Sequence, residues 1–566
     1  MIRAMPHPPR RRAALKRTAR PPNRPPSAHP GIRTADSAPE RGSCGRPHRS
    51  HRRDFATTAS PVATTSMNDL NPQPTDLKSS FIRGAAWSMG MRWSIKLLGL
   101  VSTVILARIL SPGDYGIVAM AMLAVGLTEV LVNFGAETNI LRTQVLDRDI
   151  IDSAWTLRLI QGCIVAALLA LSAPLAGWFF EEPRVVWIIW VIAAGVLVSS
   201  FANIGITVAR KNFQFALEYR FNIYNKVLAV TITILAALIL KDYRALVLGI
   251  VVGYVSGVIL SYTMHPYRPA WNMTHFGSMW HFSKWLLLSG IGNYASRNTD
   301  QLVTGRIADA HTLGIYSVGA EIGQLPTAEL GPPIMRAFLP TLSAIKDDMN
   351  RVRAAVLKTF GAVNTILLPA ACGFAVVAQP LTLVLLGEKW VEVAPYLAIF
   401  AIVGAFKVAV APFTGLFLLQ GYSRLHAYMM WGEFLAFLVC AAALVPAFGV
   451  MGLAYSRLVS VVVFFLFNLN MTKTHSGIGY RDTWKALWRP ATGSAIMLVT
   501  LAWIPLPSSN VYIELALGIL AGALVYAGVI FMAWRLSGRP DGIEATLVDH
   551  ARAMRIKVAK VGRSNH

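Results

Sequence analysis

The sequence predicts an all-α protein that crosses a membrane about fourteen times. Hydrophobic residues make up 54% of its 566 residues and charged residues only 14%, whereas ordinary soluble domains are about 25% charged. Apolar segments of about 20 residues, long enough to cross the hydrocarbon layer as a helix, follow one another from Phe81 onward. The loops between them are short, so none has room for a soluble catalytic domain.

Fourteen segments of this kind can be delimited, and the charge of their loops predicts their orientation. Sixteen Lys or Arg residues are assigned to the loops after even-numbered segments, and four to the loops after odd-numbered segments. These counts include five residues within the first four positions of the segment that follows: Arg220, Lys284, Lys358 and Arg489 among the sixteen, and Arg184 among the four. Basic loops stay in the cytoplasm, so both termini are expected there. The predicted spans are 84–110, 115–138, 155–180, 184–208, 220–240, 245–264, 284–308, 313–340, 355–386, 394–420, 425–447, 449–472, 488–506 and 511–534.

An internal repeat divides the spans into two sets of six. Ala107-Arg108-Ile109 followed by Gly116-Ile117 recurs as Gly305-Arg306-Ile307 followed by Gly314-Ile315, with an offset of 198 residues. Six helices separate the copies, and an even number preserves orientation, so an axis along the membrane normal should relate the halves. The expected domains are a disordered basic tail at 1–80, six-helix lobes at 81–272 and 273–475, two additional helices at 476–536, and a basic cytoplasmic tail at 537–566.

The first 66 residues differ in composition from the rest. They hold 14 Lys or Arg and three acids, many prolines and no apolar run, a pattern typical of disorder and not of a secretory signal. Nucleic-acid binding is one interpretation of such a tail. We favour the alternative that the start is over-extended, with Met67 as the functional initiator and no nucleic-acid partner.

Polar residues form a stripe along the seventh predicted span. In a membrane such a stripe faces a cavity or a partner helix. A simpler interpretation is that Arg297 and Asp300, three residues apart, pair and hold helices together. The stripe consists of Asn293, Ser296, Arg297, Asp300, Gln301 and Thr304, which share one helical face.

The first span carries a comparable stripe that includes Arg92 and Lys96. Two lobes whose lead helices present charge toward a common centre indicate an alternating-access transporter. The candidate cargo-binding residues are therefore Arg92, Lys96, Asn293, Arg297, Asp300 and Gln301. The carboxylates that could carry a coupling proton are Asp300, Glu321 and Glu137.

Catalysis, cofactors and metals have no support in the sequence. The four cysteines, Cys44, Cys163, Cys372 and Cys440, are far apart and form no ligand spacing. No nucleophile elbow, P-loop or dinucleotide fingerprint occurs in a suitable context. We therefore expect a protein that is not an enzyme and that holds neither cofactor nor metal.

Several motifs resemble the polysaccharide exporters of the MOP flippase superfamily. The resemblance covers about residues 78–490. Its most specific parts lie at the first hairpin of each half. They are Leu-Ala-Arg-Ile-Leu-Ser-Pro-Gly-Asp-Tyr-Gly at 106–116, Asn-Phe-Gly at 133–135, Asn-Thr-Asp-Gln at 298–301, Gly-Arg at 305–306 and Leu-Gly-Ile-Tyr at 313–316.

The resemblance implies a bacterial inner-membrane flippase for undecaprenyl-diphosphate-linked oligosaccharide in O-antigen or exopolysaccharide export. It also implies a cationic central cavity, which maps onto Arg92, Lys96, Arg297 and Asp300, and partners that include the bilayer, a polysaccharide polymerase and chain-length proteins. An ion-coupled multidrug or metabolite antiporter of the same fold is the main alternative and would need a smaller, more apolar cavity. A membrane glycosyltransferase would need a large acidic loop, and a scaffold would not need charges within its spans.

Overall fold

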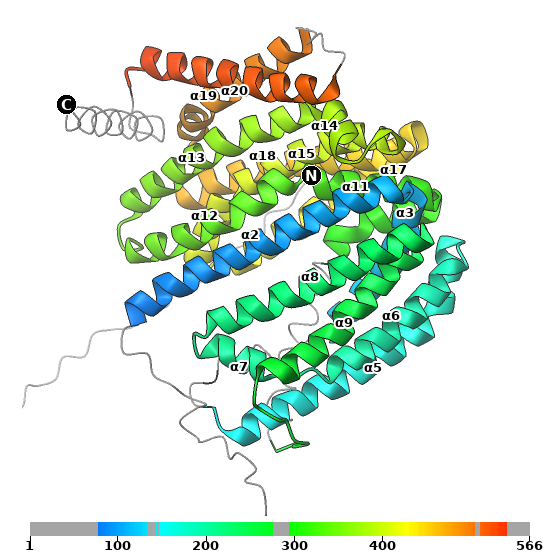
Figure 1. Ribbon diagram of the computed structural model, residues 1–566. Helices are drawn as coiled ribbons and strands as arrows, with labels where there is room; N and C mark the ends of the chain where they lie inside the picture. Colours follow the sequence, from blue (N-terminus) through cyan, green and yellow to red (C-terminus); the bar gives the residue numbers. More distant parts are fainter. Residues whose placement is uncertain are drawn as a thin grey trace, which may run out of the picture. The chain divides into compact units, whose positions relative to one another are not determined.

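The computed structural model describes residues 77–132, 146–274, 294–503 and 510–539, together with Ile140 and Thr143. Within these residues every regular element is a helix (Figure 1). The basic tail, Met67 and the C-terminal tail lie outside the described residues.

The helices of the N-terminal half pack mainly with their neighbours in sequence. α5 lies against α6 and α8 against α9, while α2 packs on α8 and α3 packs on α5 and α6 (Figure 1). These helices are α2 (Leu77–Ile109), α3 (Pro112–Val132), α5 (Arg148–Phe180), α6 (Arg184–Ser200), α7 (Gly205–Lys211), α8 (Phe215–Leu240) and α9 (Arg244–Met264).

The C-terminal half begins, in the described residues, with a helix at 294–307. α15 is central to this half, because it contacts α11, α13 and α18. The labelled helices are α11 (Ala310–Gly323), α12 (Leu325–Ala344), α13 (Met349–Val376), α14 (Ala378–Leu385), α15 (Val393–Ala409), α16 (Ala411–Leu419), α17 (Ser423–Phe448), α18 (Val450–Ser476), α19 (Tyr480–Trp503) and α20 (Val511–Leu536), with a short 3₁₀ turn, η1, at Glu388–Trp390.

The described part of each predicted span contains a helix or a pair of helices, and residues 133–138, 284–293 and 504–506 of three spans lie outside the described residues. Nine helices there are long and apolar enough to cross a membrane, or ten if α6 and α7, bent by 61°, form one span. Proline explains two of the breaks, because Pro326 and Pro412 are the second residues of α12 and α16, within the first turn, where a missing N–H costs least. The total of fourteen spans stays a prediction.

Local signals fix several helix ends. The Asp309 carboxylate accepts a hydrogen bond from the Thr312 amide at 3.0 Å and caps the start of α11. This hydrogen bond lowers the pKa of the Asp309 carboxyl. At the other end of a helix, Gly477 follows α18 with φ of 67°, a left-handed conformation that favours glycine.

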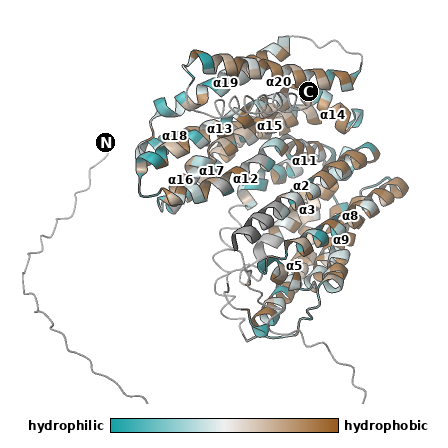
Figure 2. Ribbon diagram, turned by 60° about the vertical axis from the view of Figure 1, so that its left-hand side comes forward, coloured by the Kyte–Doolittle hydropathy of each residue, from teal (hydrophilic) through white to brown (hydrophobic). Residues whose placement is uncertain are grey.

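The outer faces of the helices are apolar, as a bilayer requires. Leu171 on α5, Ile239 on α8 and Leu524 on α20 are 77%, 80% and 73% exposed. Figure 2 shows hydrophobic residues dominating the long helices. Such an exposed apolar surface is stable only in lipid, so these faces mark the membrane-contacting side of the protein.

Two glycines from the repeated motif meet where α3 crosses α11. A Cβ atom added to Gly116 would lie 1.6 Å from the carbonyl oxygen of Ala310. One added to Gly314 would lie 1.9 Å from the carbonyl oxygen of Pro112. Gly314 is the repeat equivalent of Gly116, and Ala310 is that of Pro112, each at the offset of 198 residues. The contact is therefore reciprocal, as expected on an approximate two-fold axis.

The repeated arginines beside this crossing each reach into the other half. Arg108 donates to the carbonyl oxygen of Val384 at 2.6 Å. Arg306 forms an ion pair with Glu181 at 2.5 Å. These side chains are largely exposed, so each contact is weak, but both occur at the same end of the two lead helices.

Large aromatic residues support the same contacts from inside. Trp390 donates through Nε1 to the carbonyl oxygen of Ala107 at 2.8 Å, and the ring of Phe180 lies against Gly305. Ala107 and Gly305 are equivalent positions of the repeat, so each half receives one aromatic ring from the other.

We predict that replacing Gly116 by Ala destabilises the protein. The added methyl group cannot fit without moving the backbone of α11, and overpacking of this kind costs about 1–3 kcal/mol or more. Gly113→Ala is the control, because its Cβ would meet only the Ser111 hydroxyl at 3.7 Å. Thermal unfolding of purified protein should show a lower midpoint for Gly116→Ala alone; equal midpoints would contradict a close crossing.

Candidate substrate-binding cavities

A charged cavity lies where the lead helix of the N-terminal half faces α11 and α12. We call it the junction cavity; its volume is about 450 Å³. Three cations and two carboxylates line it, which is unusual within spans and marks a candidate functional site. The side chains are Arg92 and Lys96 from α2, Lys226 from α8, Glu321 from α11 and Glu329 from α12.

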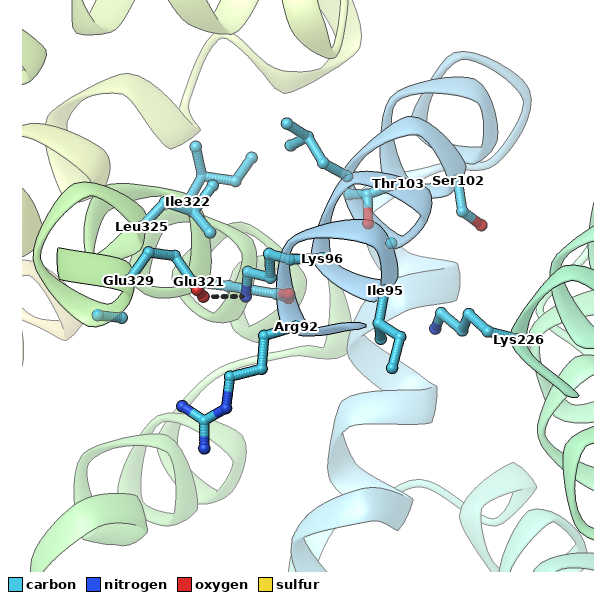
Figure 3. A pocket seen from close by; sticks show the side chains of 13 residues that line it. Arg92, Ile95, Lys96, Ser102, Thr103, Lys226, Glu321, Ile322, Leu325 and Glu329 are labelled. Carbon is cyan, nitrogen blue, oxygen red and sulfur yellow. Dashed lines mark ion pairs between the residues drawn. The ribbon is translucent and has the colours of Figure 1, made fainter. Parts of the chain in front are cut away.

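The predicted residues Arg92 and Lys96 therefore share one cavity. Lys96 pairs with Glu329 at 3.8 Å, a loose contact between partly exposed side chains. Figure 3 shows Arg92 extending away from this pair. The guanidinium of Arg92 is exposed, and its planar fork suits phosphate or carboxylate oxygens.

The polar stripe of the 294–307 helix lines a second cavity, the C-half cavity, of about 440 Å³. Ala328 of α12 lines both this cavity and the junction cavity, so the two are adjacent. Three of its four charged side chains are cationic. Its polar lining comprises Arg297, Asp300, Gln301, Gln324, Thr327, Lys407 and Arg457.

A buried ion pair forms one wall of the C-half cavity. Nη2 of Arg457 lies 2.9 Å from Oδ1 of Asp300, and both side chains are almost completely buried. Nε of the same arginine donates to Oδ2 at 3.2 Å, and the Tyr316 hydroxyl donates to Oδ2 at 3.1 Å. Oδ2 thus accepts two hydrogen bonds, whereas Oδ1 has the ion-pair contact with Arg457 and accepts no hydrogen bond, so the arginine supplies most of the compensation for this buried charge.

Arg457 also fixes the position of the helix that carries the stripe. Its Nη1 donates to the carbonyl oxygen of Ser296 at 3.0 Å, and its guanidinium lies 4.5 Å from the centre of the Phe437 ring. The sequence suggested Arg297 as the partner of Asp300, and the structure shows a buried ion pair between Asp300 and Arg457 of α18. Arg297 itself is exposed and lines the C-half cavity.

A third cavity, which we call the N-half cavity, lies among α2, α3, α8 and α9. Its volume is about 560 Å³, and it shares Ile95, Ser102 and Lys226 with the junction cavity. Asn222 and Asn225 supply amides to its lining. These two residues were not among the sequence candidates, although Asn222, Asn225, Lys226 and Thr233 at steps of 0, 3, 4 and 11 repeat the stripe pattern.

The remaining sequence candidates have different positions. Gln301 lines the C-half cavity, and Glu321 lines the junction cavity. Asn293 and Glu137 lie outside the described residues. Among the residues that the structure describes, no group of three or more His, Cys, Asp or Glu side chains could hold a metal ion.

The apolar helices and the charged cavities among them are those of a multi-pass membrane protein. Residues 105–395 match the family model described as "Polysaccharide biosynthesis protein", and the chain belongs to that family. The fold class that the sequence predicted is confirmed, as is its resemblance to polysaccharide exporters.

Curated relatives and solved structures agree with this assignment. The chain is 24% identical over 421 residues to the lipopolysaccharide biosynthesis protein WzxC of Escherichia coli K12, covering 73% of this chain and 85% of the relative. It is 21% identical over 469 residues to the teichuronic acid biosynthesis protein TuaB of Bacillus subtilis 168, covering 81% and 96%. The lipid II flippase MurJ, in an inward closed conformation, has a similar fold, with a TM-score of 0.64 and 13% identity over 80% of this chain and 99% of MurJ.

We predict that Asp300→Ala lowers both abundance and thermal stability. The substitution leaves Arg457 buried without its carboxylate, and breaking a buried pair in this way costs about 3–5 kcal/mol. The double variant Asp300→Leu with Arg457→Met should recover much of the loss, because it removes both charges. The thermal midpoint measured in detergent is the readout, and a single variant as stable as the wild type would contradict the role of the pair.

Proposed function

We propose that this protein is a flippase that moves an undecaprenyl-diphosphate-linked oligosaccharide across the bacterial inner membrane for polysaccharide export. The observation that carries the proposal is the pair of adjacent cationic cavities inside an apolar helical bundle. The relatives WzxC and TuaB, whose names place them in lipopolysaccharide and teichuronic acid biosynthesis, support it. The cargo chemistry fits, because a diphosphate needs cations and a polyprenyl chain needs lipid.

In this proposal Arg92, Lys96 and Arg297 bind the diphosphate. The two cavities that hold them meet at Ala328, so an elongated anionic group can contact both. Arginine forks bind phosphate oxygens in a bidentate manner, and a cavity that excludes bulk water strengthens the attraction. Gln301 would add a neutral hydrogen-bonding group beside Arg297.

Alternating access is the proposed mechanism. The crossing of α3 and α11 joins the halves near the loops between the first two helices of each half, and these loops are expected to face the periplasm. The structure would then be closed on the periplasmic side and would receive cargo from the cytoplasm. Asp300 is committed to Arg457, so Glu321, which lines the junction cavity, is the better placed of the described carboxylates for coupling to a proton.

The flipped product would pass to a polysaccharide polymerase and chain-length proteins, which we propose as functional partners. The protein itself would perform no covalent chemistry, so its activity is transport and not catalysis.

We predict that Arg297→Ala abolishes export while the protein still inserts normally. The guanidinium is exposed and lines the C-half cavity, so its loss removes a cation that the cargo would contact. Arg297→Lys should retain little activity, because the planar fork is lost. Transfer of lipid-linked oligosaccharide in membrane vesicles, at matched protein levels, is the measurement.

Arg244→Ala is the matched control for this experiment. Arg244 is an exposed arginine that pairs with Asp242 in the loop before α9, and it lines none of the three cavities. Full transfer by Arg297→Ala at normal abundance would remove Arg297 from the mechanism.

We also predict that both termini are cytoplasmic, as the loop-charge asymmetry of sixteen to four requires. A reporter fused after Trp534 should be active only when it is of a kind that works in the cytoplasm. Activity of a periplasmic reporter at that position would reverse the orientation and with it the direction of access.

A further inference from the structure

The helix α8 has two faces of different chemistry. Its outer face is apolar and exposed, with Leu228, Leu235 and Leu238 exposed by 43%, 52% and 56%. Its inner face carries Asn222 and Asn225, which line the N-half cavity. Placing amide side chains within a membrane span costs free energy unless their donors and acceptors have partners. The amides on this inner face therefore need an explanation.

Helix packing explains only part of the amide chemistry. Asn225 accepts a hydrogen bond through Oδ1 from the Ser256 hydroxyl at 2.5 Å, and Asn222 donates through Nδ2 to the carbonyl oxygen of Glu218 at 2.8 Å. An asparagine offers both an acceptor and two donors. Nδ2 of Asn222 also donates to Sδ of Met91 at 3.5 Å. These contacts use the amide nitrogen of Asn222 and the amide oxygen of Asn225, so the Asn222 oxygen and the Asn225 nitrogen are the ends that can serve a ligand in the cavity that both residues line.

We infer that the N-half cavity is a subsite for a neutral sugar of the cargo. The inference rests on the proposed function and deepens it. Sugars combine hydroxyl groups, which both donate and accept, with apolar C–H faces. The lining matches this combination, because the amides and Ser102 lie beside Val230, Ile250 and the ring of Tyr254.

The position of the cavity supports the same ligand. In a sugar diphosphate lipid the first sugar is bonded directly to the diphosphate. The N-half cavity adjoins the junction cavity through Ile95, Ser102 and Lys226, and Figure 3 shows Lys226 of α8 facing Ile95 of α2. A diphosphate near Arg92 would therefore place its sugar within reach of α8. At about 560 Å³, the cavity is in the ordinary size range of ligand sites.

Other parts of the cargo fit this cavity less well. A polyprenyl chain would leave the amides of Asn222 and Asn225 without partners, which costs free energy in an apolar setting. A second anion would find a single cation, Lys226, among the lining residues. The neutral sugar is the cargo component that satisfies the amides and the apolar surface together.

Gly253 on α9 permits a direct test, because it lines the cavity and a Cβ there would meet only Ala229 at 3.7 Å. Gly253→Leu should fill the cavity without breaking any side-chain hydrogen bond. Asn225→Leu should remove the amide at similar size. Gly432→Leu on α17 is the control, since nothing lies within 4 Å of its added Cβ.

The experiment measures binding of undecaprenyl diphosphate, with and without one attached glucose, to the full-length protein in nanodiscs. The wild type should bind the glucosylated lipid about tenfold more tightly, the value expected for one or two good hydrogen bonds. Both cavity variants should bind the two lipids with equal affinity and keep the wild-type affinity for the bare lipid. The control should retain the tenfold preference.

The remaining outcomes separate the subsite from the flippase function. A preference retained in both cavity variants, or an equal loss of affinity for both lipids, overturns the sugar subsite. Equal binding of both lipids by the wild type also overturns it and leaves the proposed function standing. If the wild type binds neither lipid, the proposed function falls and the subsite falls with it.

Discussion

The ion pair between Asp300 and Arg457 determines what the C-terminal half can present to a ligand. Two opposite charges inside a bundle surrounded by lipid must stay together, because either alone carries a desolvation penalty of several kcal/mol. The pair joins α18 to the 294–307 helix, and Tyr316 adds α11 to the same point. This constraint orients the stripe, so Arg297 and Gln301 line the cavity while Asp300 is withdrawn into the wall.

Much of the fold could be predicted from the sequence, because membrane crossing imposes a length and a polarity on each helix. The polar stripe of the seventh span could be recognised for the same reason, because polar residues on one face stand out in a segment that lipid requires to be apolar. The partner of Asp300 was not, since Arg457 is 157 residues away and only tertiary packing brings it close. Local spacing favoured Arg297 because it is three residues away on the same face, yet a longer-range arginine forms the buried pair.

The polar face of α8 was missed for a different reason. Asn222 and Asn225 lie in the polar first part of α8, together with Glu218, Arg220 and Lys226, and such a stretch is also what the end of a span beside a loop contains. The spacing of the two asparagines indicates a cavity-lining face only once the structure shows the exposed leucines on the opposite side of α8. The sequence predicted one central cavity, whereas the described residues line the junction, C-half and N-half cavities. The junction and N-half cavities are separate because α2 lies between α8 and α12 and presents a different face to each.

The reciprocal contact of Gly116 and Gly314 also bears on how the two halves could diverge after a duplication. A residue on an approximate two-fold axis contacts its own equivalent in the other half. A substitution in one copy therefore changes the packing of the other copy as well. Positions away from the axis are free of this mutual restraint. Along the lead helices Gly99 corresponds to Arg297, and Ser102 to Asp300. The two copies are thus alike at the crossing of α3 and α11 and differ at these cavity-lining positions.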